Sequence, residues 1–270
     1  MIISCYIENY FLGKFTDIFP NKGHKSEKIS NFAVKFGFVM ANILNIETST
    51  TVCSAALSSD GQVLEHHENY DGQTHATLLS MFIQDILKYA DSREMALDAV
   101  AVSIGPGSYT GLRIGLSEAK GLAFGKGIPL IGINTLQLLA VTTMFAHFFD
   151  DDDTLFVPMI DARRMEVYTA AYRSSLDAVV TPQAMILDED SFSHLLDQHH
   201  LVFCGNGAEK AQAVIKHRNA EFFAGVKPEA LHMTALAEKA FRENRFIDVA
   251  YSTPLYLKEF QATRPKKNLL

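Results

Sequence analysis

One order of secondary-structure elements is predicted twice along this chain. Each half begins with three strands, a helix, a fourth strand and a second helix, judged by alternating and helical spacing of apolar residues, and the first half continues with a fifth strand and a third helix. Hairpins join antiparallel strands and crossover helices join parallel ones, so this order predicts a mixed sheet covered by helices in each half. The expected fold is therefore α/β, with two similar domains and β-β-β-α-β-α repeated. The first half consists of strands 43–47, 51–57, 62–67, 99–104 and 129–133 and helices 74–90, 110–125 and 136–149; the second consists of strands 155–161, 166–173, 179–187 and 201–204 and helices 191–198 and 208–218, followed by a last helix at 233–244.

The domain boundaries follow from charge and turn chemistry. Residues 1–39 carry five lysines against three carboxylates and no amphipathic period, while a strong strand begins just after Met40. We expect residues 1–39 to be a non-native or disordered extension, with a natural arm as the alternative. Four consecutive carboxylates at Asp150–Asp153 indicate a solvated linker, and they lack the ligand spacing of a calcium loop. The expected domains are 40–150 and 151–262, followed by a tail at 263–270.

Composition narrows the class of protein. The 270 residues carry 24 Lys and Arg against 31 Asp and Glu, a formal charge of −7, which disfavours direct nucleic-acid binding as the main task. The three cysteines, Cys5, Cys53 and Cys204, form no CxxC motif and indicate a reducing compartment. No apolar run is long enough to span a membrane. We expect a cytoplasmic protein with no membrane partner.

Two segments offer polar groups to an anion. Glu47, Thr48 and Ser49 lie between the first two predicted strands, where a bend exposes hydroxyls and backbone N–H groups. Gly105–Ser108 joins a strand to a helix, a place where N–H groups can approach a phosphate, although the standard phosphate-binding motifs are absent. The candidate anion or nucleotide contacts are Glu47, Thr48, Ser49, Gly105, Gly107 and Ser108. The alternative is a polar turn that satisfies its own backbone.

The helix that follows carries small residues at every fourth position. Gly111, Gly115, Ala119 and Ala123 form this stripe, and glycine in a helix is unfavourable, which calls for a packing or binding reason. A small-residue stripe allows another helix to approach closely.

A third segment is a charged hairpin tip in the second half, with Asp161, Arg163, Arg164 and Glu166. It could meet a ligand or remain a solvated turn. Catalytic patterns are weak: HExxH and GxSxG are absent, and the residue four positions after His75 is Leu79 rather than a second histidine that could share a metal. We expect no catalytic residue and no metal ligand in this chain.

Together these segments resemble the TsaB (YeaZ) family, accessory proteins of bacterial tRNA threonylcarbamoyladenosine synthesis. The resemblance rests on Ile43–Ser49, Ile104–Gly115, Ala119–Ala123, Asp161–Arg164 and Glu166–Tyr168. It implies an actin-like, ribonuclease-H-type fold in both domains. It also implies a catalytic paralogue, TsaD, as partner, with the small ATPase TsaE, while tRNA is met through the complex. The catalytic paralogue carries a histidine pair where this chain has only His75, which puts the family's old metallopeptidase label in doubt.

In that family the first two helices pair with those of a partner. The resemblance therefore implies an accessory subunit of a tRNA threonylcarbamoyladenosine transferase complex, which uses ATP and a metal ion not held by this chain. Homodimerisation stays open, and so does the alternative that the apolar residues of the first helix all face the chain's own sheet. An actin-like ATPase or kinase is the alternative function, and a metallopeptidase is disfavoured. The expected interface residues are His75, Leu78, Leu79, Phe82, Gly111, Arg113, Gly115 and Ala119.

Overall fold

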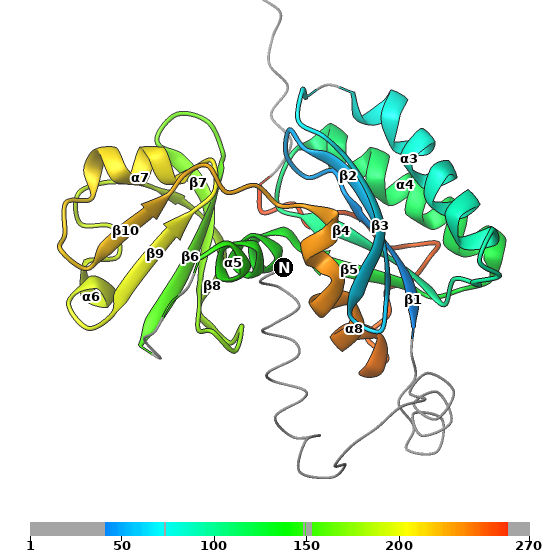
Figure 1. Cartoon of the computed structure of the whole chain (residues 1–270). Coiled ribbons are helices and arrows are strands. Elements are labelled where there is room, and N and C mark those ends of the chain that lie inside the picture. Colours follow the sequence, from blue (N-terminus) through cyan, green and yellow to red (C-terminus); the bar gives the residue numbers. More distant parts are fainter. Residues whose placement is uncertain (1–40, 73, 148, 150–152, 259–270) are drawn as a thin grey trace, which may run out of the picture. The chain divides into compact units, whose positions relative to one another are not determined.

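The computed structural model describes residues 41–72, 74–147, 149 and 153–258. The described residues, from Ala41 onward, form one compact unit. The predicted extension at 1–39, the tail at 263–270 and most of the acidic run lie outside the described residues. The elements are β1 (Asn42–Glu47), β2 (Cys53–Ser59), β3 (Gln62–Asn69), α3 (His75–Asp91), β4 (Ala99–Gly105), α4 (Tyr109–Lys126), β5 (Leu130–Asn134), α5 (Thr135–Ala146), β6 (Thr154–Asp161), β7 (Glu166–Tyr172), β8 (Ala178–Ile186), α6 (Ser193–Leu196), β9 (His200–Cys204), α7 (Ala208–Val214), β10 (Ala220–Phe223), the 3₁₀ helix η1 (Ala230–Met233) and α8 (Thr234–Arg242) (Figure 1).

The strands form two five-stranded sheets with the same topology. The first has the order β3-β2-β1-β4-β5, and the second, read in the matching direction, has the order β8-β7-β6-β9-β10. In each sheet the first three strands are antiparallel hairpins and the later ones join in parallel through helices. The predicted mixed sheets and the predicted repetition are confirmed.

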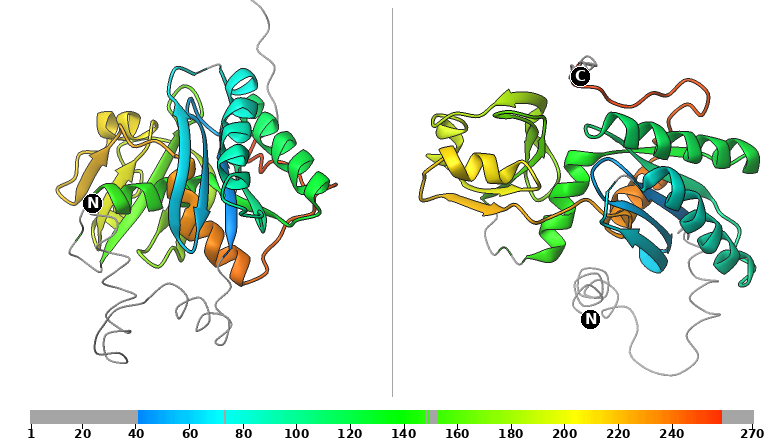
Figure 2. Two further views of the ribbon diagram at one scale, coloured as in Figure 1. Left: turned by 45° about the vertical axis from the view of Figure 1, so that its right-hand side comes forward. Right: turned by 90° about the horizontal axis from the view of Figure 1, so that it is seen from above.

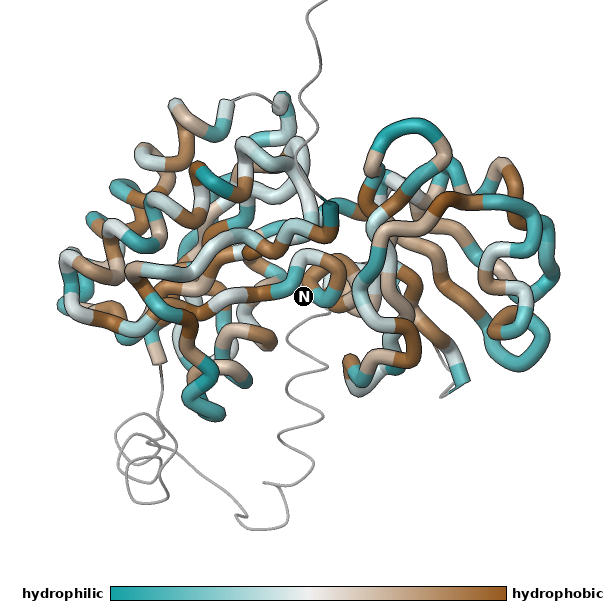
Figure 3. Tube along the Cα trace, turned by 180° about the vertical axis from the view of Figure 1, so that it is seen from behind, coloured by the Kyte–Doolittle hydropathy of each residue, from teal (hydrophilic) through white to brown (hydrophobic). Residues whose placement is uncertain are grey.

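Helices cover both faces of the first sheet. Leu79, Ile83 and Ile86 of α3 and Leu116 of α4 pack on one face, and Met233, Leu236 and residues of α5 pack on the other. Helix α5 is buried along most of its length, because Leu138 and Val141 pack with the first sheet while Leu136 and Leu139 pack with the second. Helices α3 and α4 run side by side (Figure 2). The inner strands β4 and β6 are mainly apolar, whereas the edge strand β3 and most loops are polar (Figure 3).

Four local predictions need correction. Strand β10 was not predicted, because four residues after a turn show too little alternation. Helix α7 ends at Val214 rather than at residue 218, since Ile215 adopts an extended backbone. The predicted helix at 136–149 ends at Ala146 as α5. Thr74, the first residue of the predicted helix 74–90, precedes α3, and its hydroxyl donates to Asn69 Oδ1 at 3.0 Å.

The last predicted helix, 233–244, is α8 preceded by the 3₁₀ turn η1. No helix in the described part of the chain is both long enough and apolar enough to cross a bilayer.

Candidate functional site

The β1–β2 turn and the Gly105–Ser108 loop lie against each other, as the strand order requires. Ser108 N donates to Ser49 O at 2.6 Å across the two segments. Glu47, the last residue of β1, is completely buried, and its Oε1 accepts from Ser49 N at 2.5 Å. Its Oε2 has no hydrogen-bond partner among the described residues. Burial raises the pKa of the Glu47 carboxyl to about 7, because the charged form loses its hydration.

The glycines of the loop allow close contact with that turn. A Cβ atom at Gly107 would lie 2.3 Å from Ser49 O, and one at Gly111 would lie 2.1 Å from Thr48 O. The start of α4 is also satisfied within the chain, since Ser108 Oγ accepts from Gly111 N at 3.2 Å and Thr48 Oγ1 donates to Gly111 O at 2.8 Å. These contacts correspond to the alternative of a self-satisfied polar turn.

The structure therefore brings the six candidate anion contacts together but explains their glycines without a ligand. The carbonyl of Ser49 lies close to Gly107, and Glu47 at the end of β1 is completely buried. Anion binding at this turn stays a prediction.

The small-residue stripe of α4 faces inward. A Cβ atom at Gly115 would lie 2.2 Å from Thr48 Oγ1, and Ala119 and Ala123 are fully buried in the core of the first sheet. The stripe thus admits the β1–β2 turn and the sheet of its own chain, which corrects the prediction that it admits another helix. The spacing identified a face of α4 correctly and assigned it to the wrong neighbour.

The same correction applies to part of α3. His75 is buried, and its Nε2 lies 3.0 Å from Thr50 O, where an N–H can donate to the carbonyl; Leu79 is fully buried beneath the helix. Leu78 and Phe82 are partly buried. Thus His75, Leu79, Gly111, Gly115 and Ala119 are not available on the surface of the folded chain.

The outer face of the two helices carries other residues, which sequence reasoning missed. Phe124 of α4 is 82% exposed and Met81 of α3 is 55% exposed. Gly121 and Gly125, on the same helix as Phe124, have no atom within 4 Å of the position of a Cβ atom. Their spacing of four residues was available in the sequence, but it could not be distinguished there from the buried stripe. We call these exposed residues, Met81 in the second turn of α3 and Gly121, Phe124 and Gly125 towards the end of α4, the outer α3–α4 face.

The chain's own carboxyl-terminal segment contacts Arg113, which remains exposed. This guanidinium lies 4.1 Å from the centroid of the Tyr109 ring, and its Nε donates to Tyr256 Oη at 3.1 Å. Further along α4, Lys120 Nζ donates to the carbonyls of Ala250 and Ser252 at 3.0 and 2.6 Å. Helix α4 is therefore in contact with residues 250–256 through Arg113 and Lys120, which the sequence did not predict.

The charged hairpin tip of the second half joins β6 and β7. Asp161 Oδ1 accepts from Arg163 N at 2.5 Å and pairs with Lys210 Nζ at 2.7 Å. Glu166 forms an ion pair with Lys258 of the carboxyl-terminal segment. Arg163 and Arg164 are exposed. The tip is thus a network of ion pairs, and a role in binding stays a prediction.

Metal ligands are not grouped in the part of the chain that the structure describes: no three His, Cys, Asp or Glu side chains lie close enough to hold an ion. Cys53 and Cys204 are buried, and burial raises the pKa of the Cys53 thiol to about 11 and that of Cys204 to about 12. Neither thiol is ionised near neutral pH, so neither offers the thiolate that metal binding or nucleophilic attack requires.

Comparison with known proteins supports one family. The family model for TsaD, tRNA N6-adenosine threonylcarbamoyltransferase, matches residues 62–265. The tRNA threonylcarbamoyladenosine biosynthesis protein TsaB of Escherichia coli is 31% identical over 227 residues, covering 80% of this chain and 94% of that protein. TsaB of Bacillus subtilis is 30% identical, covering 82% and 95% of the two chains.

Solved structures agree with these relatives. The structure of YeaZ from Pseudomonas aeruginosa matches with a TM-score of 0.67 and 26% identity, covering 81% of this chain and all of that one. Two mixed five-stranded sheets with this strand order make the actin-like fold that the resemblance implied. The sequence relatives and the fold lead to one conclusion: this chain belongs to the TsaB family of tRNA threonylcarbamoyladenosine biosynthesis proteins.

Proposed function

We propose that this chain is a non-catalytic accessory subunit that supports threonylcarbamoylation of the adenosine next to the anticodon, in tRNAs reading codons that begin with adenine. Its partner is a catalytic paralogue of the TsaD type, with a TsaE-type ATPase in the complete system. ATP, the metal ion and tRNA act in the complex. The catalytic paralogue is a natural partner because the family model of TsaD itself matches most of this chain, so both proteins present related helices.

The outer α3–α4 face is the observation that carries this proposal. Phe124 is 82% exposed and lies next to two glycines with open space around them, and Met81 on the neighbouring helix is 55% exposed, so these residues are free to contact a partner. Gly121 and Gly125 leave open space beside Phe124, so a partner helix can approach the backbone of α4 closely. Both helices rest on a buried sheet, which holds the face rigid for docking.

The non-catalytic part of the proposal is supported by the surroundings of His75. Its imidazole is directed at the carbonyl of Thr50, and the following turn of α3 presents the buried Leu79. Glu47, whose carboxyl has a strongly raised pKa, is buried by residues of its own chain. Neither group can reach a substrate without rearrangement of the turn.

The experiment is co-purification of this chain with the TsaD homologue of the same organism, followed by a threonylcarbamoyl-transfer assay. We expect transfer only when both proteins are present. Phe124→Asp and Gly121→Leu should weaken pairing by at least tenfold, because the first places a charge and the second places bulk in the interface. The matched controls are Ile186→Asp and Gly225→Leu, which alter an exposed apolar residue and an open glycine of the second half.

The results separate the alternatives. Equal pairing of the outer-face variants and the controls contradicts the assigned face, and full transfer by the TsaD homologue alone contradicts the accessory role. ATP turnover by the isolated chain favours the ATPase or kinase alternative. Size-exclusion chromatography of the isolated chain, with and without Phe124→Asp, reports whether the same face also makes a homodimer.

A further inference from the structure

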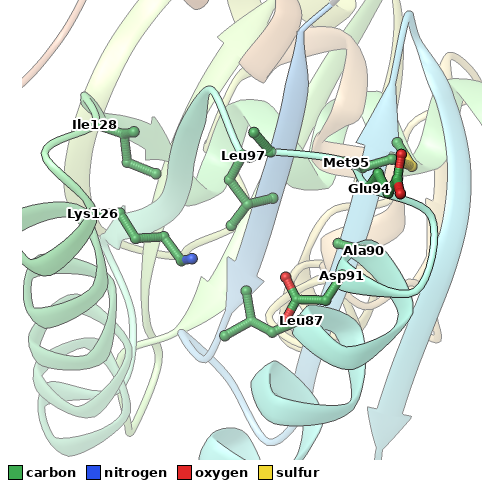
Figure 4. A pocket seen from close by; sticks show the side chains of 9 residues that line it. Leu87, Ala90, Asp91, Glu94, Met95, Leu97, Lys126 and Ile128 are labelled. Atoms are coloured by element: carbon green, nitrogen blue, oxygen red, sulfur yellow. The ribbon is translucent and has the colours of Figure 1, made fainter.

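A pocket of about 420 Å³ lies where α3 and α4 both end. Its apolar lining comes from Leu87 and Ala90 of α3 and from Met95, Leu97 and Ile128 of the two loops that follow the helices (Figure 4). This volume is within the range of pockets that hold small molecules. The pocket is at the opposite end of α4 from the Gly105–Ser108 loop, and it borders the outer α3–α4 face, because Lys126 directly follows Gly125.

Three charged side chains surround this apolar lining. Asp91 is the last residue of α3, Lys126 is the last residue of α4, and Glu94 follows α3 in the loop. Figure 4 shows Asp91 and Lys126 reaching over the pocket from opposite sides, with Leu87 and Leu97 between them. Within the described part of the chain, none of the three forms an ion pair or side-chain hydrogen bond. Charges of both signs are therefore available to a ligand.

The backbone at Glu94 is in the left-handed region, as it is at six other non-glycine residues of the described part. Glu94 has φ +55, in the left-handed region, and the residue in the corresponding place after α4 is Gly127, with φ +65. Glycine adopts this conformation without strain and is the usual residue after a helix, whereas glutamate is strained there. A strained residue beside a pocket is a reason to look for function.

The electrostatics select the ligand's charges. The carboxyl ends of both helices carry partial negative charge and, with Asp91 and Glu94, favour an ammonium group. The ammonium of Lys126, on the opposite side, favours a carboxylate. The apolar residues of the lining favour a hydrocarbon side chain on a ligand whose two charges are close together.

We propose that this pocket binds a small zwitterion with an apolar body, most simply an apolar α-amino acid. Its ammonium lies at Asp91 and Glu94, its carboxylate at Lys126 and its side chain against Leu87, Leu97 and Ile128.

Three probes of one size test the proposal: L-phenylalanine, phenethylamine, which lacks the carboxylate, and 3-phenylpropionate, which lacks the amine. Each is titrated into the full chain with labelled leucine and isoleucine methyl groups, observed by NMR. We expect saturable shifts at Leu87, Leu97 and Ile128, and about fivefold tighter binding of L-phenylalanine than of either analogue, one charged contact being lost in each case. Absence of saturable shifts with L-phenylalanine, or equal affinity for all three probes, overturns the proposal.

Two variants separate the charged contacts, and neither is expected to unfold the chain. Glu94→Gly relieves the left-handed strain, so its Tm should stay the same or rise while binding of L-phenylalanine and phenethylamine weakens and that of 3-phenylpropionate does not. Lys126→Met should weaken the binding of L-phenylalanine and of 3-phenylpropionate but not the binding of phenethylamine. Lys239→Met, which removes an exposed lysine of α8, is the matched control and should leave all three affinities unchanged. The same loss for every probe in every variant contradicts the assigned contacts.

Discussion

The two sheets share one strand order but surround the carboxylate at the end of their first strand differently. Glu47 ends β1 and Asp161 ends β6, and each accepts a hydrogen bond at 2.5 Å from the backbone N–H two residues further on. Glu47 is completely buried, and burial raises its pKa to about 7. Asp161 is exposed and pairs with Lys210 at 2.7 Å.

The helices after the fourth strand of each sheet explain this difference. Helix α4 has 18 residues, and Gly111 and Gly115 bring it down onto Thr48. Helix α7 has 7 residues and supplies Lys210, whose ammonium reaches Asp161. The same position in a repeated topology thus becomes an enclosed acid in one half and an open ion pair in the other. The covering helix decides which chemistry results, because water is excluded only in the first half.

The largest expected effect comes from opening the contact between α4 and the β1–β2 turn. Gly115→Leu should lower the free energy of unfolding by about 3 kcal/mol or more, because its Cβ atom would lie 2.2 Å from Thr48 Oγ1 and cannot be accommodated without moving the turn. Urea unfolding measures the loss. Gly121→Leu on the same helix has open space and should change stability by less than about 1 kcal/mol. Similar losses for both variants would show that the helix tolerates no bulk on either face.

A comparable effect should appear in the pH dependence of stability. The Glu47 carboxyl has a pKa of about 7 in the folded chain against 4.5 as its ordinary value, so between these values the folded state holds a proton that the unfolded state has lost. The free energy of unfolding should therefore fall as pH rises from about 4.5 to 7, by roughly 3 kcal/mol from this residue. Glu47→Gln has no group that titrates at this position. Its free energy of unfolding relative to that of the wild type should therefore be higher at pH 8 than at pH 5. Parallel stability curves for the two proteins contradict an enclosed acid.

The smallest effect is expected at the open carboxylate. Lys210→Met should cost about 1 kcal/mol or less, because its ion pair with Asp161 is partly exposed and screened by solvent. Asp161→Ala should cost more, since Arg163 N then loses its acceptor as well. Thermal unfolding at low and high salt measures both. A loss of several kcal/mol for Lys210→Met would mean that the second half is as enclosed as the first.

Much of the fold could be predicted because it is recorded in local spacing. Alternation and turn residues located β1 to β4, and helical spacing located α3 and α4 to within a few residues. Strand β10 could not be predicted in this way, because four residues paired to β9 are specified by that neighbour rather than by their own pattern. The contacts of residues 250–256 with α4 likewise join segments far apart in the sequence.

The candidate site shows the same limit at the level of single side chains. Helical spacing correctly placed Gly111, Gly115 and Ala119 on one face of α4, but spacing carries no information about what that face meets. The sequence contained a second row of small residues, ending in Gly125, with Phe124 beside it. Only the position of the sheet distinguishes the buried row from the exposed one.

The sequence by itself determined the repeated order of elements, the polar turn after β1 and the small residues of α4, because these depend on dihedral preferences and on periodicity along the chain. The tertiary structure decided that the polar turn is enclosed by its own helix, that Glu47 holds its proton to about pH 7, and that Met81 and Phe124 remain exposed. It also decided that the ends of α3 and α4 enclose a pocket with charges on opposite sides. Burial and charge separation are properties of groups brought together from distant positions, so they exist only once the chain has folded.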